Sequence, residues 1–385
     1  MGRKIILVLI ILIGLAILAT FLILAFYHPE RVANTNYTNL STVRAVRVDY
    51  RDVEKSRGEV AALETQLKQI GVNMVAVGAG RPDWTYFPWT DHQDRWSDEV
   101  KTTGNDYLLA DSTRFGKWAH VSAVVDVLAP LYIQAHPEKA AISWIGVPSK
   151  NLVSTMELVD GAFGQDLLDM IENIATYYPV NSITLTELVY YVDGFGEQDK
   201  AAYLAYTGRS DWPRTDEGQI NIDDNSIGTW RSYEIARFLE KAAGIVHQHD
   251  KLFFVEERIG VDSAGQVFVN NGTDFNLFLT YADRLVVRGS NDPEGRSPQA
   301  MSAIGQYLDH YQNGRVIMSV GLWDKDYDPT MSKSQMSAIS ASDFQTSLQS
   351  TTQGGMTDLW ITPSFLMTDA HWLVLEDFLK SLSDK

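Results

Sequence analysis

The sequence predicts an α/β protein: a (β/α)8 barrel of parallel strands, preceded by one N-terminal transmembrane helix. Two observations predict the barrel. From residue 43, short β-rich apolar runs alternate with longer segments of helical period, the pattern of parallel strands joined by crossover helices. The cycle repeats about eight times, as in a fold that takes ~250 residues before loop insertions. A long uncharged run near the N-terminus predicts the membrane helix.

The N-terminal run covers residues 5–27 and contains no charged side chain. At ~1.5 Å per helical residue it can cross a hydrocarbon core of ~30 Å, and it is longer than the ~7 to 15 apolar residues of a cleaved signal peptide. Arg3 and Lys4 precede it, so the N-terminus is expected to stay cytoplasmic. We therefore expect an uncleaved anchor in residues 1–27 with the lipid bilayer as partner of residues 5–27, a polar linker in 28–41, and an extracytoplasmic barrel domain in 42–385.

Composition excludes several functional classes. The chain of 385 residues has 49 Asp and Glu against 32 Lys and Arg, a net charge of −17, and no cysteine. A surface this acidic repels phosphate backbones, so we expect no nucleic-acid partner. Without cysteine there is no disulfide framework, no thiolate-held zinc and no cysteine nucleophile. We also find no metal or nucleotide motif, and we expect neither metal nor cofactor.

The first half of the chain is predicted as four strand–helix units. The first strand is 43–50, and its helix begins with the capping box Ser56–Glu59 and ends at Gly71. The second strand is 73–80; after a Trp-rich loop, apolar residues at helical spacing in 115–128 predict the second helix. The third strand is expected at 140–147 and the fourth from Asn181; between them, apolar residues from Leu167 to Ile174 predict the third helix, which ends near Pro179. A polar insertion follows.

The second half continues the same alternation. The fourth helix is expected from Thr229, the fifth strand from Leu252, a short fifth helix capped by Asp274, and the sixth strand from Arg284. The next helix covers 297–313, strands seven and eight cover 315–323 and 359–363, and Asp369 caps a closing helix. An open doubly wound sheet is the alternative fold. It would favour a G-x-G-x-x-G loop after the first strand, where this chain has charged residues at 51–55.

Acidic side chains follow several of the predicted strands. Because the active site of such a barrel lies at the C-terminal strand ends, we expect these acids to meet at one rim. Two carboxyl groups flanking a bond are what glycoside hydrolysis requires. The candidate catalytic residues are Glu187, Glu257 and Asp324. The structural alternative is that Glu257 pairs with Arg258, and Glu256 with Arg288.

Aromatic residues are the second feature of the predicted rim. Sugar rings pack their flat C–H faces on aromatic rings, so a cleft lined this way suits an oligosaccharide. The alternative for tryptophans on strands, Trp144 and Trp360, is the core. The candidate substrate-binding residues are Asp49, Trp84, Tyr86, Trp89, Tyr191, Arg288, Trp323 and Trp360.

The alternation of side chains along the fourth strand limits the role of Glu187. If Thr184 and Thr186 point into the barrel, Glu187 points outward with Leu185. A bend at the end of the strand is needed to bring its carboxylate into the mouth.

One stretch of the sequence resembles a known family. Residues 178–188, Tyr-Pro-Val-Asn-Ser-Ile-Thr-Leu-Thr-Glu-Leu, and the later Trp230-Arg231 resemble the putative glycosyl hydrolases related to clan A barrels, including the barrel halves of enzymes that cut poly-N-acetylglucosamine. The loop Tyr86-Phe87-Pro88-Trp89 is also similar. Where the family has two adjacent aspartates, this chain has Thr186 and Glu187. The resemblance implies either a shifted mechanism, with Glu257 or Asp324 as second carboxylate, or a protein that binds glycan without cleaving it.

Together these features predict a membrane-anchored hydrolase of a cell-surface polysaccharide or exopolysaccharide. Glu187 would be the general acid with a raised pKa, Glu257 or Asp324 the base or nucleophile, and Arg288 and Tyr191 would orient the sugar. The alternative is a catalytically inactive glycan-binding or envelope-scaffold protein on the same barrel. Two carboxylates within ~5 to 10 Å of each other at the mouth would favour the enzyme. A metal-dependent phosphoesterase is disfavoured, because no histidine falls at a predicted strand end.

Overall fold

The computed structural model describes residues 42–48, 57–261, 267–269, 272–289, 298, 300–311, 314–324 and 336–383. Within these ranges, every helix is too short or too polar to traverse a lipid bilayer. The predicted anchor 5–27, the linker 28–41 and the candidate residue Asp49 lie outside the described residues.

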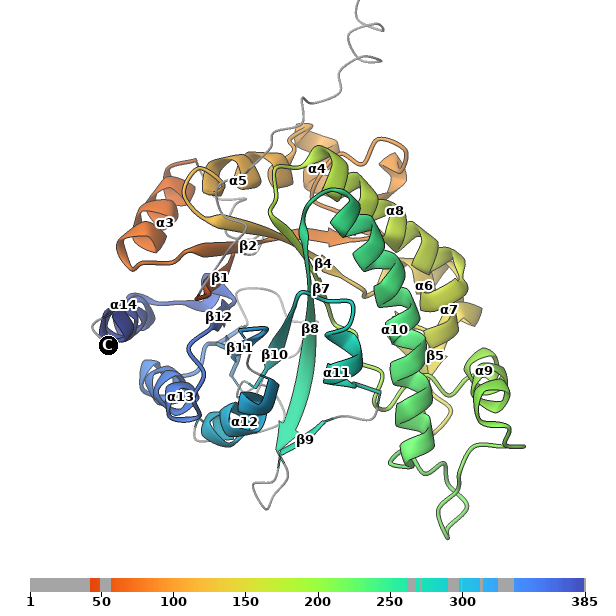
Figure 1. The fold of residues 1–385 in the computed structure, drawn as a ribbon. Coiled ribbons are helices and arrows are strands. Elements are labelled where there is room, and N and C mark those ends of the chain that lie inside the picture. The colour runs from red at the N-terminus through yellow and green to blue at the C-terminus, as the bar shows by residue number, and fades with distance from the viewer. Residues whose placement is uncertain are drawn as a thin grey trace, which may run out of the picture.

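Eight parallel strands close into a barrel in the described part of the chain, as the sequence predicted. Each pairs with the next along the chain, and the last pairs with both its predecessor and the first (Figure 1). The strands are β1 (Arg44–Val48), β2 (Met74–Arg81), β4 (His120–Asp126), β7 (Ser182–Thr186), β8 (Leu252–Val261), β10 (Arg284–Arg288), β11 (Val316–Gly321) and β12 (Leu359–Thr362).

Helices cover the outside of the strands (Figure 1). They are α3 (Arg57–Gln69), α4 (Asp98–Thr103), α5 (Tyr107–Phe115), α6 (Pro130–Ala135), α7 (Thr155–Asp160), α8 (Ala162–Tyr177), α9 (Glu197–Thr207), α10 (Asn225–Gln248), α11 (Phe275–Phe278), α12 (Ala300–Leu308), α13 (Ala341–Gln353) and α14 (Asp369–Ser383). Short antiparallel strands extend the sheet: β3 (Trp84–Thr85) pairs with β2, and β9 (Val267–Val269) pairs with β8. The pair β5 (Ala140–Ile142) and β6 (Pro148–Val153) forms a separate two-stranded sheet.

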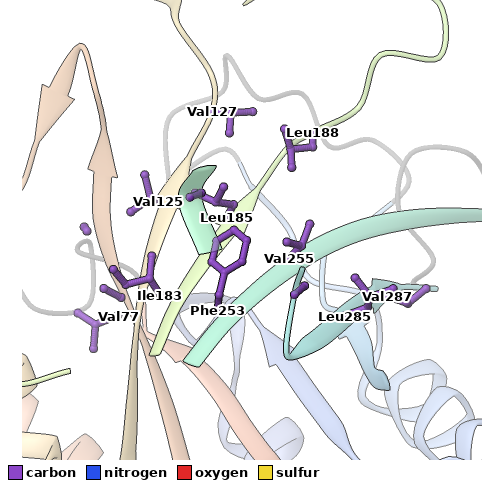
Figure 2. Packing of buried hydrophobic residues seen from close by; sticks show 14 of the residues in the cluster. Val77, Val125, Val127, Ile183, Leu185, Leu188, Phe253, Val255, Leu285 and Val287 are labelled. Atoms are coloured by element: carbon purple, nitrogen blue, oxygen red, sulfur yellow. The ribbon is translucent and has the colours of Figure 1, made fainter. Parts of the chain in front are cut away.

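The barrel strands are buried on both faces. Outward-facing residues such as Ile183, Phe253 and Val287 pack in the layer between strands and helices (Figure 2). The alternate residues fill the interior in a second cluster that includes Val124, Phe254 and Trp360. This double burial explains why the strands read as nearly continuous apolar runs.

A row of hydrogen bonds joins β4 to β7 inside the barrel. His120 Nε2 lies 2.8 Å from Ser182 Oγ, and the hydroxyls of Ser122 and Thr184 are 2.7 Å apart. At the end of the row, Thr186 Oγ1 donates to Asp126 at 2.5 Å. Ser182, Thr184 and Thr186 therefore point into the barrel, the orientation considered in the sequence analysis.

Two neighbouring elements of the predicted barrel, its second helix and its third strand, are wrong. The second helix was expected at 115–128, but helix α5 ends at Phe115 and residues 120–126 form the third barrel strand, β4. The apolar residues there matched a helical spacing only because nearly every position of this doubly buried strand is apolar. Residues 140–147, predicted as that strand, instead belong to the β5–β6 sheet, and Trp144 lies in its turn.

The polar insertion after β7 builds a small core of its own. Helix α9 and the start of α10 enclose Phe195, Tyr203, Trp212, Ile227 and Trp230, and Trp144 packs against this cluster. Helix α10 begins at Asn225, earlier than predicted, because Asp224 caps it by accepting a hydrogen bond from the Ser226 amide at 2.9 Å.

Candidate functional site

A polar layer occupies the mouth of the barrel at the C-terminal ends of the strands. Along each strand, every second residue beyond the interior apolar cluster keeps the same inward direction. The residues that reach this layer come from seven strands: Arg47, Asp126, Thr186, Glu256, Arg288, Ser319 and Thr362. This is the end of such a barrel at which active sites lie.

Glu187 joins this layer through a turn of the backbone. Strand β7 ends at Thr186, and Glu187 has a φ of +67°, a left-handed conformation that is uncommon outside glycine. The Val189 amide donates to the Glu187 carbonyl at 2.8 Å. The turn directs the Glu187 side chain into the mouth, although strand alternation alone would point it at the helices. It is the bend that the sequence analysis required, and such strain often marks functional sites.

Two guanidinium groups hold the Glu187 carboxylate. Arg258 Nη2 lies 2.8 Å from Glu187 Oε2, and Arg288 Nη2 lies 3.1 Å from Glu187 Oε1. Arg288 also pairs with Glu256, the ion pair proposed as the structural alternative, and its guanidinium carbon lies 5.4 Å from the Trp323 ring centroid. Arg258 pairs with Glu187, whereas the alternative had assigned it to Glu257.

The predicted role of Glu187 as an acid with a raised pKa is wrong. Burial alone would raise the pKa of Glu187, but the charges of Arg288 and Arg258, with a smaller effect of Arg47, lower it to about 2. At neutral pH the Glu187 carboxyl is therefore an anion. It can stabilise positive charge or attack as a nucleophile, but it holds no proton to donate.

Glu257 lies on the other side of the barrel wall. In β8, Phe254, Glu256 and Arg258 face inward, so Glu257 faces the helices, where it is 1% exposed. Thr273 Oγ1 donates to its Oε2 at 3.2 Å, and its Oε1 has no hydrogen-bond partner. It lines a small cavity with Tyr190 and Arg231. This placement contradicts the prediction that Glu257 shares the mouth with Glu187.

Burial, with a smaller effect of the nearby Glu256 charge, raises the pKa of Glu257 to about 8 against the opposing effect of the Thr273 hydrogen bond. The raised pKa expected for an acid catalyst is thus found at Glu257, away from the mouth. Its environment explains the value without any catalytic role.

The carboxylate that does share the mouth is Asp126, which the sequence analysis missed. It ends β4, accepts the Thr186 hydrogen bond, and lies 3.4 Å from Arg47 Nη2. Its side chain is partly exposed. The residue was overlooked because its strand was taken for a helix. The run of β-branched residues ending in an aspartate, His-Val-Ser-Ala-Val-Val-Asp, was the available signal.

Asp324 and Tyr191 have other partners. Asp324 follows β11 at the rim, where its carboxylate accepts a hydrogen bond from Ser337 Oγ at 3.4 Å. Tyr191 Oη donates to Asp223 at 3.0 Å, and its side chain lines the small cavity beside Glu257. The structure therefore does not bring Tyr191 to Arg288 as the two sugar-orienting residues of one site.

The predicted aromatic platform is only partly accessible. Tyr86 and Trp89 are 1% and 2% exposed, so they pack in the core, and Trp360 is fully buried in the barrel interior. These three residues are corrections to the substrate-binding set, because no sugar can reach their rings. Trp84 on β3 and Trp323 after β11 are partly exposed, with Arg81 and Arg288 against their rings, and the contact with Arg288 places Trp323 at the mouth.

The described residues contain no cluster of three or more His, Asp or Glu side chains that could hold a metal ion. The chemistry that the mouth offers is that of two carboxylates, Glu187 and Asp126, in a field of three arginines. Counting Glu256, the three acids balance Arg47, Arg258 and Arg288 in formal charge.

The chain has the fold of glycoside hydrolase (β/α)8 barrels. It is similar to the PgaB (BpsB) glycoside hydrolase domain from Bordetella bronchiseptica, with a TM-score of 0.62 and 15% identity over 88% of this chain and 99% of that domain. A β-galactosidase from Marinomonas ef1 gives 0.60 at 11% identity, over 88% of this chain and 59% of that one.

The catalytic domain of a β-amylase from Paenibacillus polymyxa gives a TM-score of 0.56 at 12% identity, over 88% of this chain and 97% of the other. No family model and no curated sequence matches the chain. The resemblance predicted from residues 178–188 is therefore confirmed at the level of the fold.

Proposed function

We propose that this protein binds a polysaccharide or oligosaccharide across the barrel mouth and hydrolyses a glycosidic bond with Glu187 and Asp126 as its two carboxylates. The observation that carries the proposal is the left-handed turn at Glu187, which turns an ionised carboxylate into the mouth at a conformational cost of ~1 to 3 kcal/mol. If this position had only a structural role, a glycine would adopt the same left-handed conformation without that cost. The fold shared with glycoside hydrolases supports the same reading.

The environments of the two acids assign their roles. Glycoside hydrolysis passes through a transition state with positive charge on the sugar ring. Glu187, kept anionic by Arg258 and Arg288, suits the position facing that charge, as nucleophile or electrostatic stabiliser. Asp126, whose side chain is partly exposed and lies 3.4 Å from Arg47, is the second carboxylate of the mouth, and we assign it the remaining role of proton donor or base. Trp323 and Trp84 offer their rings to the sugar faces.

A second candidate, binding without cleavage, is favoured by one observation. Arg288 pairs with both Glu187 and Glu256, and Arg47 pairs with Asp126, so each of the three mouth carboxylates has an arginine partner. Paired carboxylates and arginines also suit hydrogen bonding to sugar hydroxyls. Under this candidate the barrel would hold the glycan and release no product.

The location of the activity rests on the sequence alone. We propose that residues 5–27 anchor the chain in a lipid bilayer and that the barrel works on the extracytoplasmic side, on a cell-surface or secreted glycan. Protease protection in intact cells tests this, since an extracytoplasmic barrel is digested from outside whereas a cytoplasmic one is not.

The two candidates are separated by measuring cleavage and binding together. Full-length protein in detergent is incubated with a polysaccharide panel that includes poly-N-acetylglucosamine; new reducing ends and retained protein are both measured. We expect Glu187→Gln and Asp126→Asn each to lower reducing-end release by ~100-fold or more, and the exposed control Glu240→Gln to leave it unchanged. Binding by the wild type without release from any substrate would favour the second candidate, and neither binding nor release would reject both.

A further inference from the structure

A groove lies on the outer wall of the barrel, away from the mouth. Its volume is about 510 Å³, within the ~300–1,000 Å³ of small-ligand sites. It is lined by residues of α10, of the segment leading into α11, and of the end of α12. Four tyrosines contribute: Tyr206, Tyr233, Tyr307 and Tyr311.

The groove exists because the helical layer is thin at this point. Helix α11 spans only Phe275–Phe278, whereas the preceding helix α10 spans Asn225–Gln248. Figure 1 shows the short α11 beside the long α10. A full-length helix after β8 would fill this space, so its absence opens the outer layer between α10 and α12.

The tyrosines form two pairs of neighbouring rings, one exposed and one partly buried. Tyr206 and Tyr233 are 43% and 45% exposed, and their ring centroids are 5.1 Å apart with an interplanar angle of 33°. A second pair, Tyr307 and Tyr311, has centroids 6.0 Å apart, and Phe275 packs edge-on against Tyr311 at 5.6 Å. A ligand that covers the exposed rings removes apolar surface from water, which favours binding.

The remaining lining is polar and almost uncharged. Asn225, Thr229 and Ser232 contribute amide and hydroxyl groups, and Asp274 is the one charged side chain among the described residues that line this groove. Its Oδ1 accepts the Leu277 amide hydrogen bond at 3.0 Å as the cap of α11. The described part of the lining contains no cation, so it offers no partner to the charge of an anionic ligand.

Flat rings combined with hydroxyl and amide groups match one ligand chemistry. A sugar presents C–H faces to aromatic rings and hydroxyls to hydrogen-bonding side chains, and a neutral sugar needs no charge partner. We propose that this outer groove is a second binding site for an uncharged stretch of glycan. It is separate from the mouth, and it rests on the proposed function only in taking the ligand to be the same polysaccharide.

A small cavity lies between the groove and Arg258, the partner of Glu187 in the mouth. Gly272 and Thr273 line both the groove and the small cavity that contains Glu257. Glu257 faces outward from β8, while Glu256 and Arg258 face inward to the mouth. None of the residues that line the groove takes part in the ion pairs of Glu187, Arg258 and Arg288, so substitution of Tyr206 and Tyr233 removes no partner of the mouth.

The test uses full-length protein in detergent and neutral tetrasaccharides of β-linked glucose, xylose and N-acetylglucosamine, with binding measured by calorimetry. We expect the double variant Tyr206→Ala/Tyr233→Ala to bind at least one of them roughly tenfold more weakly at the groove. The control Tyr177→Ala removes a tyrosine of α8 that is 37% exposed and lies outside the groove, and it should bind as the wild type does. Tyr206→Phe/Tyr233→Phe, which keeps the rings, should retain most of the affinity.

A mouth variant, Arg288→Ala, separates this proposal from the proposed function. Groove binding should persist in Arg288→Ala, while cleavage and mouth binding are weakened. The Tyr206→Ala/Tyr233→Ala variant should have the melting temperature of the wild type. If this folded variant binds all three tetrasaccharides as the wild type does, the groove is not a sugar site. The proposal is also overturned if the wild type binds none of the three tetrasaccharides. It is overturned as well if Arg288→Ala loses all binding, because the sugar would then bind in the mouth alone.

Discussion

Replacing Glu257 by glutamine tests whether this residue belongs to the catalytic mouth or to the barrel wall. Glutamine keeps the shape of the side chain and the acceptor for the Thr273 hydroxyl, and it cannot ionise. The structure predicts that Glu257→Gln changes the pH dependence of stability and leaves catalysis in place. A catalytic Glu257, as the sequence suggested, would give the opposite result.

The magnitude follows from the raised pKa. A carboxyl whose pKa is higher in the folded than in the unfolded chain stabilises the fold when protonated. Its contribution is complete below the unfolded value and is lost as the pH rises through the folded value. For Glu257 these values are 4.5 and about 8. The difference, at ~1.4 kcal/mol per pH unit, corresponds to ~5 kcal/mol lost between about pH 4.5 and pH 8.

The assay is urea unfolding followed by tryptophan fluorescence, at intervals from pH 5 to pH 9. Subtracting the wild-type free energy of unfolding from that of Glu257→Gln cancels the titration of all other groups. The difference should increase with pH by several kcal/mol in favour of the variant, while reducing-end release at pH 6 stays within ~3-fold of wild type. A flat difference would refute the assigned environment, and a loss of release by ~100-fold or more with unchanged folding would restore Glu257 to the active site.

Three further predictions concern the mouth and the core. Arg288→Met should raise the pKa of Glu187 from about 2 toward its ordinary value, so the acid limb of the pH–activity profile moves to higher pH; an unmoved limb would contradict the pairing. Glu187→Gly should be more stable than Glu187→Ala by ~1 kcal/mol in urea unfolding, because only glycine adopts the left-handed φ without penalty, and equal stabilities would argue against the turn. Trp360→Ala should lower the free energy of unfolding by ~3 to 5 kcal/mol, whereas Trp84→Ala should leave it nearly unchanged and weaken sugar binding.

The barrel itself could be predicted from the sequence because helix ends, caps or turn residues separate seven of its strands from the neighbouring helices. Gly71, with a φ of +80°, ends α3 where the sequence placed a helix end, and Asp274 caps α11 as expected. The error fell at β4, a strand buried on both faces whose apolar residues satisfy helical and strand spacing equally. Only the pairing of β4 with β2 and β7, a tertiary fact, decides between them.

Because of this error at β4, the sequence analysis missed one residue of the candidate site. Strand ends were searched for acids, and an unassigned strand has no end to search, so Asp126 was not found. The aromatic platform failed for a different reason. Tyr86 and Trp89 were placed in a loop, and loops are usually exposed, but this loop folds over the sheet: the Tyr86 amide donates to Ala79 at 3.1 Å and the Trp96 indole donates to Trp89 at 2.8 Å. Composition cannot reveal that a loop is packed.

The opposite placements of Glu187 and Glu257 follow from where their strands end. Both residues have the parity that directs a side chain outward, and both were predicted to reach the mouth. Strand β7 stops at Thr186, so no further ladder hydrogen bond constrains Glu187, and its backbone is free to adopt the left-handed turn. Strand β8 continues to Val261 and pairs with β10 at Glu257, so a similar turn there would break the sheet. An acid near a strand end can therefore be redirected, and one within the ladder cannot.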